Sequence, residues 1–373
     1  MSALRVGLST TTTEPGLTGG RLDGIGVYSK ALLGALPSAG VAVQPYSFGA
    51  ASALSVGRRM PLPFPLSTLR DLATPGFVRQ GMDVDIFHAT DYRIIRMDKP
   101  VVATLHDALP IAYPQWCNPK QRQLKNWLQV KAARKADHVI AVSQFAVAEL
   151  VQCFGVDERR ISVVHNGVDE EWLQPPAPDA MAATLARHGL RQGYYLFVGT
   201  LQPRKNVERI LQAYLGLPAV IRAARQLAVV GAPGWRSEDL QRQLRAAAER
   251  GENVRWLDRL TDEEELRQLY AGAGALVFPS LYEGFGIPIV EAFASRVPVI
   301  AGNATSLPEV CGGAALEVDP LSVQDIGAAM LDIVRDDALR ARCIAAGERR
   351  AVQLTWRETA RKTAAVYKTI LKQ

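Results

Sequence analysis

Short apolar runs alternate with amphipathic segments through the first part of the chain. The runs that predict strands are Leu4–Ser9, Val41–Ser47, Ile86–Ala89, Val101–His106 and His138–Ser143, and a further one begins over Ile161–His165. Between them, hydrophobic residues recur at helical spacing, for example over Val27–Leu36 and Gln121–Lys135. The strand runs are not strictly alternating, which is typical of strands covered on both faces. Repeated βαβ units of this kind predict a doubly wound parallel sheet.

A second and more regular series begins near residue 194. Strand and helix patterns alternate over Tyr194–Thr200, Asn206–Leu217, Gln226–Ala232, Ser237–Arg250, Asn253–Asp258, Asp262–Ala273, Ala275–Ser280, Ile287–Arg296 and Pro298–Gly302. A final amphipathic segment, Thr355–Leu371, is long enough to return to the first series. The whole pattern predicts an α/β protein with two Rossmann-like doubly wound parallel-sheet domains facing a cleft.

The break between the two series sets the domain boundary. Residues 171–193 are rich in proline and alanine at their start and end in glycine, which is typical of a connection between domains. We therefore predict a first domain over residues 1–172, to which a C-terminal helix over 355–373 returns, and a second domain over 173–354.

Composition narrows the class of protein. The chain has 373 residues, of which 48% are hydrophobic and 21% charged, as in an ordinary soluble enzyme. It contains no apolar run long enough to span a bilayer, and its first residues, MSALRVGLST, lack the pattern of a signal peptide. Its four cysteines form no CxxC pair, which argues against a zinc site or a disulfide framework. We therefore expect a cytoplasmic protein.

The formal net charge of +6 is unevenly distributed. Between residues 120 and 135 six basic residues occur without an acidic one, and Trp116 and Trp127 lie close by. Such a face suits anionic lipid head groups, although a solvated helix surface explains it equally well. No nucleic-acid-binding module accompanies it, so we expect no nucleic-acid partner.

The stretch "PSLYEGFGIPIVEAFA" (279–294) carries candidate chemistry. A strand leads into a glycine turn and then a helix, with Glu283 on the turn and Glu291 in the helix. Ligands of open parallel sheets bind beyond the carboxyl ends of the strands, and the amides at a helix start favour phosphate. Carboxylates there would instead accept hydrogen bonds from neutral hydroxyls. A nucleotide sugar, with its ribose diol, diphosphate and hexose, has this alternation of groups.

A second motif, "VGTLQPRKNVERI" (198–210), follows the first strand of the second series. Arg204 and Lys205 are adjacent cations before a helix that Asn206 is able to cap. Two such charges suit a diphosphate, and they would stabilise it as a leaving group.

Together these motifs resemble the family-4 retaining glycosyltransferases of the GT-B fold. The resemblance rests on the E-x7-E spacing of Glu283 and Glu291, on "VGTLQPRKN", on "HNGVD" (165–169) and on "ATSLPEVCGGAA" (304–315). In the first series it extends to the glycine-rich "GGRLDGIGVYS" (19–29). The resemblance implies a first domain that holds the acceptor and a second that holds the nucleotide sugar.

The resemblance also implies roles for individual residues. Glu291 is expected to hold the ribose hydroxyls, and Glu283 to face the hexose. Arg204 and Lys205 are expected to hold the diphosphate. The turn and helix start that approach the donor comprise Gly284, Phe285, Gly286 and Ile287.

In the first domain, "LHD" resembles the family's sugar-pocket histidine. His106 is the catalytic candidate, with Asp107 beside it, and Gly24 and Gly26 are expected to bring loop backbone near the phosphates and the acceptor. The expected reaction retains the anomeric configuration, and the leaving phosphate deprotonates the acceptor.

Two other motifs point to different chemistry. Asp83 and Asp85 spell DxD, which holds a metal in another glycosyltransferase fold, but they directly precede a strand and have no recognisable partner ligand. A strand-edge role is favoured, and no obligatory metal or cofactor is expected. "GIGVYS" (24–29) imitates a dinucleotide fingerprint but does not directly follow its strand, which disfavours an NAD-dependent oxidoreductase.

The finer resemblance is to bacterial mannosyl- and rhamnosyltransferases of O-antigen synthesis, on "VGTLQPRKN" and "LHDALPIAYP". It implies transfer of mannose or D-rhamnose from a GDP-sugar to a lipid-linked or oligosaccharide acceptor at the inner face of the plasma membrane. Residues 60–81 and 120–135 would then contact the anionic membrane. The alternatives are a UDP-sugar-dependent transferase, a nucleotide-sugar epimerase on the same scaffold, and a catalytically silent scaffold protein.

Overall fold

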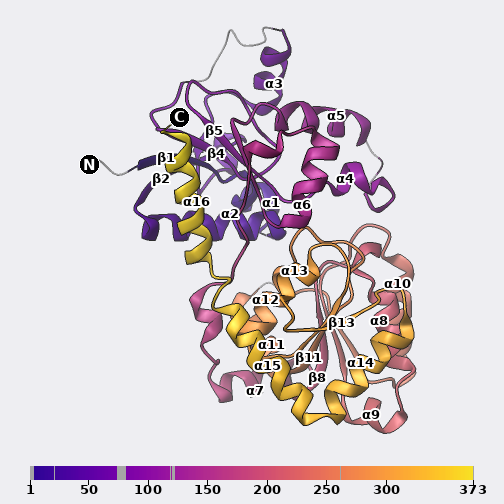
Figure 1. Cartoon of the computed structure of the whole chain (residues 1–373). Helices are drawn as coiled ribbons and strands as arrows, with labels where there is room; N and C mark the ends of the chain where they lie inside the picture. The colour runs from indigo at the N-terminus through magenta and orange to yellow at the C-terminus, as the bar shows by residue number, and fades with distance from the viewer. Residues whose placement is uncertain are drawn as a thin grey trace. The chain divides into compact units, whose positions relative to one another are not determined.

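The computed structural model describes residues 4–20, 22–73, 81–117, 119, 122–260 and 262–372 (Figure 1). Contacts between residues divide the chain into two compact units. The first unit comprises Met1–Pro114, Pro119–Gly167 and Thr355–Gln373, and the second comprises Gln115–Asn118 and Val168–Leu354. Each unit is an α/β layer structure.

The first unit is built on a seven-stranded sheet of parallel strands in the order β3-β2-β1-β4-β5-β6-β7. Its strands are β1 (Leu4–Ser9), β2 (Val41–Ser47), β3 (Arg58–Arg59), β4 (Ile86–Ala89), β5 (Val101–Leu105), β6 (His138–Ala141) and β7 (Ile161–Val163). Its α-helices are α1 (Pro15–Thr18), α2 (Gly24–Ala35), α3 (Phe64–Ala73), α4 (Leu109–Ala112), α5 (Arg122–Ala133), α6 (Gln144–Glu149) and α16 (Trp356–Ile370). Every residue of β4 and β5 is buried, as expected for strands covered on both faces.

The second unit is built on a six-stranded sheet, also parallel, in the order β10-β9-β8-β11-β12-β13. Its strands are β8 (Tyr194–Val198), β9 (Leu227–Val230), β10 (Val254–Leu257), β11 (Ala273–Phe278), β12 (Val299–Gly302) and β13 (Leu316–Val318). Its α-helices are α7 (Pro178–Arg187), α8 (Val207–Leu215), α9 (Ala219–Ala224), α10 (Glu238–Glu249), α11 (Glu263–Gly272), α12 (Ile287–Ala294), α13 (Leu307–Cys311), α14 (Val323–Arg335) and α15 (Asp337–Ala351). The two parallel sheets confirm the predicted pair of doubly wound domains.

The division between the units lies earlier than the boundary predicted after residue 172. The amide of Val168 donates to the carbonyl of Leu354 over 3.0 Å. The Trp172 ring packs edge-on against Tyr270 of α11, with 5.3 Å between ring centroids. Because these contacts hold the segment on the second unit, the boundary falls after Gly167.

The stretch 171–193, interpreted from its composition as a connection, contains helix α7. Thr184 Oγ1 donates to Gln268 Oε1 of α11 over 2.6 Å, and both residues are buried. Gly272 of α11 lies so close to Leu185 that a Cβ there would stand 2.9 Å from its Cδ1. The interpretation as a bare connection was therefore wrong, because one face of α7 is part of the packed second unit.

Helix α16 packs on the first unit although it ends the chain. The Tyr367 hydroxyl lies 2.6 Å from His88 Nδ1 of β4, and Thr359 Oγ1 donates to the carbonyl of His165 over 2.8 Å. The Trp356 ring lies 5.9 Å from that of Tyr28. The residues from Thr355 onward thus belong to the first unit.

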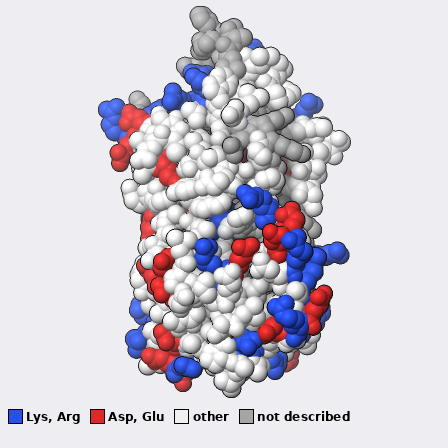
Figure 2. All heavy atoms as spheres, turned by 90° about the vertical axis from the view of Figure 1, so that its right-hand side faces the viewer, with Lys and Arg blue, Asp and Glu red and all other residues white. Residues whose placement is uncertain are grey.

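On the face drawn in Figure 2, acidic and basic side chains lie next to one another in groups that uncharged residues separate. None of the helices within the described ranges is both long and apolar enough to cross a membrane.

Candidate active site

The order of strands in the second unit determines where a ligand can bind. From β8 the chain proceeds to β9 on one side, whereas β11, the other neighbour of β8, is followed by β12 on the far side. The crevice beyond the carboxyl ends of β8 and β11 is therefore the topological switch point, where open α/β sheets bind ligands. Arg204 and Lys205 follow β8, and Glu283 follows β11. The two sequence motifs thus meet at this edge of the sheet.

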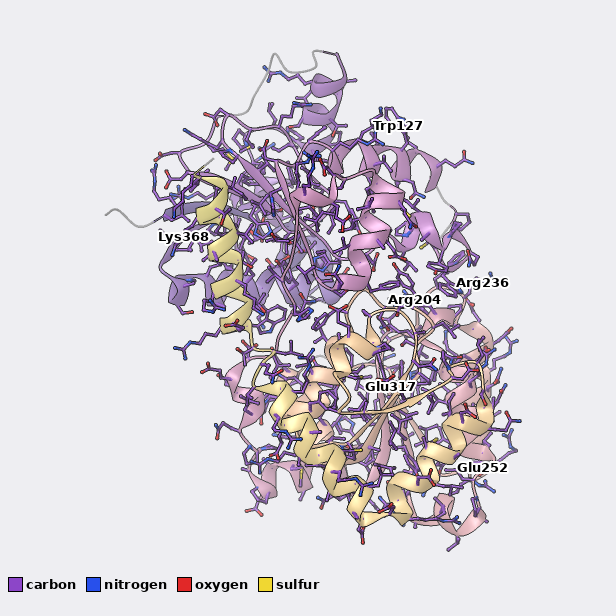
Figure 3. All side chains as sticks on the ribbon, viewed as in Figure 1. Trp127, Arg204, Arg236, Glu252, Glu317 and Lys368 are labelled. Carbon is purple, nitrogen blue, oxygen red and sulfur yellow. The ribbon has the colours of Figure 1, made fainter. Side chains whose placement is uncertain are left out.

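At the switch point the three charged side chains form one cluster. Lys205 Nζ donates to Glu283 Oε1 over 2.6 Å, and Arg204 Nη1 donates to Glu283 Oε2 over 3.0 Å. The exposed fractions of these side chains are 17% for Arg204, 11% for Lys205 and 9% for Glu283. Figure 3 labels Arg204 in the segment after β8. In the described structure both cations therefore bind Glu283, the glutamate that is expected to face the hexose.

The contacts with Lys205 and Arg204 determine the pKa of Glu283. Burial pushes the pKa of its carboxyl upward, but the charges of Lys205 and Arg204 and the hydrogen bond from Lys205 outweigh burial. The net pKa is lowered from its ordinary value, so Glu283 is ionised at neutral pH. Lys205 Nζ also lies 5.1 Å from the centroid of the Phe278 ring, so the cation faces both a carboxylate and an aromatic wall.

Asn206 ties the two loops together. Its backbone has φ 63°, in the left-handed region, and its Nδ2 donates to the carbonyls of Pro279 over 2.8 Å and Pro320 over 2.6 Å. The amide of Leu281 donates to the carbonyl of Arg204 over 2.7 Å. Asn206 does precede α8, but its side chain makes no capping bond. The expected capping role is thus wrong. Asn206 has a left-handed backbone, and its side-chain amide donates to the two loop carbonyls instead of capping α8.

The turn after Glu283 is held by residues that the sequence analysis did not single out. Ser306 Oγ donates to the carbonyls of Glu283 over 2.9 Å and Phe285 over 3.0 Å, and the amide of Glu283 donates to Thr305 Oγ1 over 3.2 Å. Thr305 and Ser306 lie within "ATSLPEVCGGAA", a stretch used only for the resemblance.

Glycine is required at the end of this turn. Gly286 has φ 106°, a conformation that other residues rarely adopt, and a Cβ there would stand 2.9 Å from Leu307 Cδ2. Helix α12 begins directly afterwards at Ile287, so the turn delivers the chain into the helix that carries Glu291.

Glu291 has a different environment from Glu283. Its Oε2 accepts a hydrogen bond from the Tyr270 hydroxyl of α11 over 2.7 Å. Burial raises the pKa of Glu291 to about 7, and the hydrogen bond from Tyr270 only partly opposes this rise. Tyr270 was not predicted, because a buried tyrosine in an amphipathic helix is indistinguishable from an ordinary core residue in the sequence.

In the first unit, His106 and Asp107 follow β5. His106 Nε2 lies 3.1 Å from the carbonyl of Thr90, which can only accept, so Nε2 carries the proton. Burial lowers the pKa of His106, which is therefore neutral near pH 7, and the Tyr28 ring packs edge-on at 4.8 Å. Asp107 Oδ1 accepts from the amide of Leu109 over 3.0 Å.

Gly24 and Gly26 lie in the first turn of α2 rather than in a loop. Asp23 caps this helix, and its Oδ1 accepts from the amide of Gly26 over 2.8 Å. A Cβ on Gly26 would stand 2.8 Å from the carbonyl oxygen of Thr12, so close approach of the backbone explains this glycine. The predicted loop was wrong because Asp23 starts the helix earlier than the apolar spacing indicates.

The two candidate sets lie in different units. Arg204, Lys205 and Glu283 contact one another in the second unit, and Glu291 follows on the adjoining helix. His106 lies in the first unit, where the charge of Asp23, the cap of α2, acts on its pKa.

Two other groups in the first unit are structural. Asp83 Oδ1 accepts from Arg5 Nη1 over 2.6 Å, and Asp85 Oδ2 accepts from the Arg5 amide over 2.9 Å, as expected for a strand edge. Glu14, which sequence reasoning missed, is buried and accepts from Ser47 Oγ and from three backbone amides of residues 55–57. No spacing in the sequence signals this cage.

Comparisons with known proteins identify the family of the chain. Residues 163–350 match the family "Glycosyl transferases group 1", and residues 22–172 match "Glycosyltransferase Family 4". The chain is 34% identical to O-antigen chain mannosyltransferase B of Escherichia coli, over 76% of this chain and 74% of that protein. It is 29% identical to the MMP alpha-(1->4)-mannosyltransferase of Mycolicibacterium hassiacum, over 82% of this chain and 74% of that protein.

Solved structures show the same fold. Sucrose-phosphate synthase from Thermosynechococcus elongatus superposes with a TM-score of 0.74 at 19% identity, covering 99% of both chains. WaaG, a glycosyltransferase involved in lipopolysaccharide biosynthesis, superposes with a TM-score of 0.64 at 15% identity, covering 97% of this chain and 98% of that one. The chain therefore belongs to the group 1 glycosyltransferases, and it is a hexosyltransferase with the GT-B fold.

Proposed function

We propose that this enzyme transfers mannose or D-rhamnose from a GDP-sugar to a lipid-linked saccharide in the synthesis of a bacterial cell-surface polysaccharide. The mannosyltransferases among its relatives support the donor sugar, and their O-antigen names support the acceptor class. The observation that carries the proposal is the cluster of Arg204, Lys205 and Glu283 at the switch point of the second sheet. The cluster provides two cations that can bind a diphosphate and a carboxylate that can accept a hydrogen bond from a sugar hydroxyl.

Donor binding must rearrange this cluster. In the free protein Glu283 pairs with both cations, and a diphosphate would replace its carboxylate as their partner. Glu283 is then released to accept hydrogen bonds from hexose hydroxyls, beside the backbone of Gly284, Phe285 and Gly286. A donor lacking its hexose would leave the freed carboxylate without a partner, so the exchange favours the complete nucleotide sugar.

The remaining donor contacts follow from the same elements. Glu291 would hold the ribose diol, and Ile287 would bring the first amide of α12 close to the phosphates. In the first unit, His106 would accept a hydrogen bond from a sugar hydroxyl through Nδ1, because its Nε2 proton faces Thr90. Asp107 and the helix start at Gly24 and Gly26 complete the proposed contacts.

The proposed chemical step proceeds with retained anomeric configuration. The acceptor hydroxyl attacks the anomeric carbon on the face from which the diphosphate departs, and its proton passes to a leaving phosphate oxygen. Arg204 and Lys205 stabilise the charge that develops on the diphosphate. Since two cations already supply this compensation, we propose that no metal ion is obligatory.

We also propose that the enzyme contacts an anionic membrane through α5. Trp127, labelled in Figure 3, is 46% exposed and Leu124 is 58% exposed. Both share one helix face with Lys131, whose Nζ lies 5.9 Å from the Trp127 ring. Exposed apolar and basic residues on one face are typical of helices that lie on anionic bilayers. Arg134 does not belong to this face, because its Nε donates to the carbonyl of Phe154. Lys120 and residues 74–80, also predicted to contact the membrane, lie outside the described residues.

Transfer assays with defined donors test the proposed function. The purified enzyme is incubated with GDP-mannose, GDP-D-rhamnose or UDP-glucose and a lipid-linked saccharide, with and without EDTA. We expect transfer from a GDP-sugar, unchanged by EDTA and with retained configuration in the product's NMR spectrum. Lys205→Ala and Glu283→Ala are each expected to lower the rate about 100- to 1000-fold, the usual cost of removing a group that stabilises transition-state charge.

Arg242→Ala and Glu238→Ala provide matched controls, because both residues are exposed on α10 of the same unit. If the enzyme transfers sugar only from UDP-glucose, the proposed GDP-sugar donor is wrong and the alternative, a UDP-sugar donor, holds. Full activity in a folded Lys205→Ala variant would contradict the proposed site.

A further inference from the structure

The second unit contains a cavity at the edge of its sheet opposite the candidate active site. The cavity has a volume of about 350 Å³. Gly193, which precedes β8, lines it together with Ala273, the first residue of β11, and Ser295, which follows α12. These positions lie at the amino ends of the parallel strands, whereas Arg204 and Glu283 follow the carboxyl ends. The cavity is therefore separate from the proposed donor site.

Among the residues that the structure describes, three arginines and no acidic residue line this cavity. Arg267 is engaged through both terminal nitrogens, because Nη1 donates to Glu264 Oε2 over 2.5 Å and Nη2 donates to the carbonyls of Glu171 and Gln174. Arg296 pairs through Nε with Glu348 over 2.7 Å. These two guanidiniums are compensated by glutamates outside the cavity.

Arg340, on α15, is the third arginine, and it differs from the other two. Its Nε is buried, and within the described part of the chain it has no hydrogen-bond partner. A buried N–H without an acceptor destabilises the folded protein, so a bound ligand that supplies an acceptor is favoured at this position. A guanidinium is a planar donor suited to carboxylate or phosphate oxygens. The cavity therefore carries one surplus positive charge at a defined position.

The rest of the lining is mainly apolar. Trp172 and Pro176 come from the segment before α7, Met181 from α7 itself, and Ala294 from the end of α12. Such a wall binds hydrocarbon or an aromatic ring but not a fully hydrated ion. We propose that this cavity binds a small amphipathic anion, with a carboxylate or phosphate group on Arg340 and an apolar body against Trp172 and the neighbouring prolines.

Calorimetric titration of the full-length protein tests this proposal. Octanoate and octyl phosphate carry the two head groups on the same chain, while 1-octanol lacks the charge and inorganic phosphate lacks the apolar body. We expect one of the two amphipathic anions to bind with a dissociation constant below about 1 mM, and about tenfold tighter than octanol or phosphate. The stronger of the two identifies the head group.

Two variants locate the binding. Arg340→Gln is expected to weaken it at least about tenfold, the value of a charge-assisted hydrogen bond, whereas Arg335→Gln, the same change at an exposed position outside the cavity, leaves it unchanged. Ser295→Tyr, which fills the cavity without changing charge, is also expected to abolish it. Equal binding by wild type, Arg340→Gln and Ser295→Tyr, or no saturable binding of either amphipathic anion, would overturn the proposal. Because binding is measured without donor, these outcomes are independent of transferase activity.

Discussion

The two glutamates of the E-x7-E motif have opposite electrostatic environments. Glu283 lies between two cations, which hold its pKa below the ordinary value despite burial. Glu291 is half-buried, its described partner is the neutral hydroxyl of Tyr270, and burial raises its pKa to about 7. One carboxylate is thus permanently ionised near neutral pH, whereas the other is poised to titrate there.

This difference predicts a pH dependence of donor binding. A ribose diol donates to the ionised carboxylate, so binding requires the form of Glu291 that is populated above its pKa of about 7. Affinity for GDP-mannose, measured by calorimetry, is therefore expected to be about tenfold weaker at pH 6 than at pH 8, in proportion to the ionised fraction. The diphosphate of a nucleotide sugar releases no proton between pH 6 and pH 8, so the donor itself does not change its affinity with pH.

Glu291→Gln provides the comparison, because glutamine has nearly the same shape and does not titrate. We expect the variant to bind GDP-mannose weakly and with equal affinity at pH 6 and pH 8. A wild-type affinity independent of pH would show that the ribose does not depend on ionised Glu291. If the affinity of the variant changes with pH as much as that of the wild type, the group that titrates is not Glu291.

Residue types and spacing predicted that these charged groups lie together at one edge of the second sheet, but not how they pair. Strand-turn-helix position identified Arg204, Lys205 and Glu283, because motifs at the carboxyl ends of parallel strands converge. The sequence could not show that the two cations bind Glu283 itself, since that depends on the separation of loops 78 residues apart in the chain. Tyr270 could not be predicted at all, for its role depends on which face of α11 meets α12.

At the level of secondary structure, buried strands were the most predictable elements. The predicted bounds of β1, β2 and β4 agree with the structure, because short apolar runs between polar turns have clear ends. Strand β13 has only three residues, one of them exposed, and shows no such run. Helix α14 is missing from the predicted elements, although its apolar residues recur at helical spacing and form a regular buried face, Ile326, Ala329, Met330 and Ile333.

The exposed face of helix α5 is predicted to bind the membrane. Replacing Leu124 and Trp127 by alanine removes two exposed apolar side chains, so it should not affect folding. If α5 lies on the membrane, the double variant is expected to bind phosphatidylglycerol vesicles at least about tenfold more weakly in sedimentation at low salt, because less apolar area is buried. Binding of the wild type should also fall as salt rises.

A matched double variant, Val220→Ala with Leu321→Ala, tests whether any exposed apolar residue has this effect. Both residues are exposed, at 72% and 62%, and both lie in the second unit. If the two double variants bind vesicles equally well, α5 is not the contact. If the wild type fails to sediment with vesicles at low salt, the proposed membrane contact is wrong.

At the scale of the whole chain, the first unit is assembled from both ends of the sequence. Tyr367, near the C-terminus, meets His88 of β4, and the other nitrogen of that ring lies 2.8 Å from Thr104 Oγ1 of β5. Thr104 Oγ1 in turn lies 2.8 Å from the Tyr28 hydroxyl of α2. All four residues are buried, so this network joins α16 to the sheet and to α2 in the first unit. Removing one member would leave a polar atom buried without its partner.

Tyr367→Phe tests whether this network fastens the end of the chain to the first unit. The change keeps the ring but deprives His88 Nδ1 of its partner, which is expected to lower the free energy of unfolding of the first unit by about 1–3 kcal/mol. Urea unfolding followed by hydrogen exchange of β4 and β5 measures that unit, while exchange of β8 and β11 should be unchanged. Tyr46→Phe is the matched control, because its hydroxyl contacts only the nearby side chain of Gln44 in the described structure. A loss shared by both sheets would mean that the units unfold as one, and no loss would mean that apolar contacts of α16 suffice to hold it.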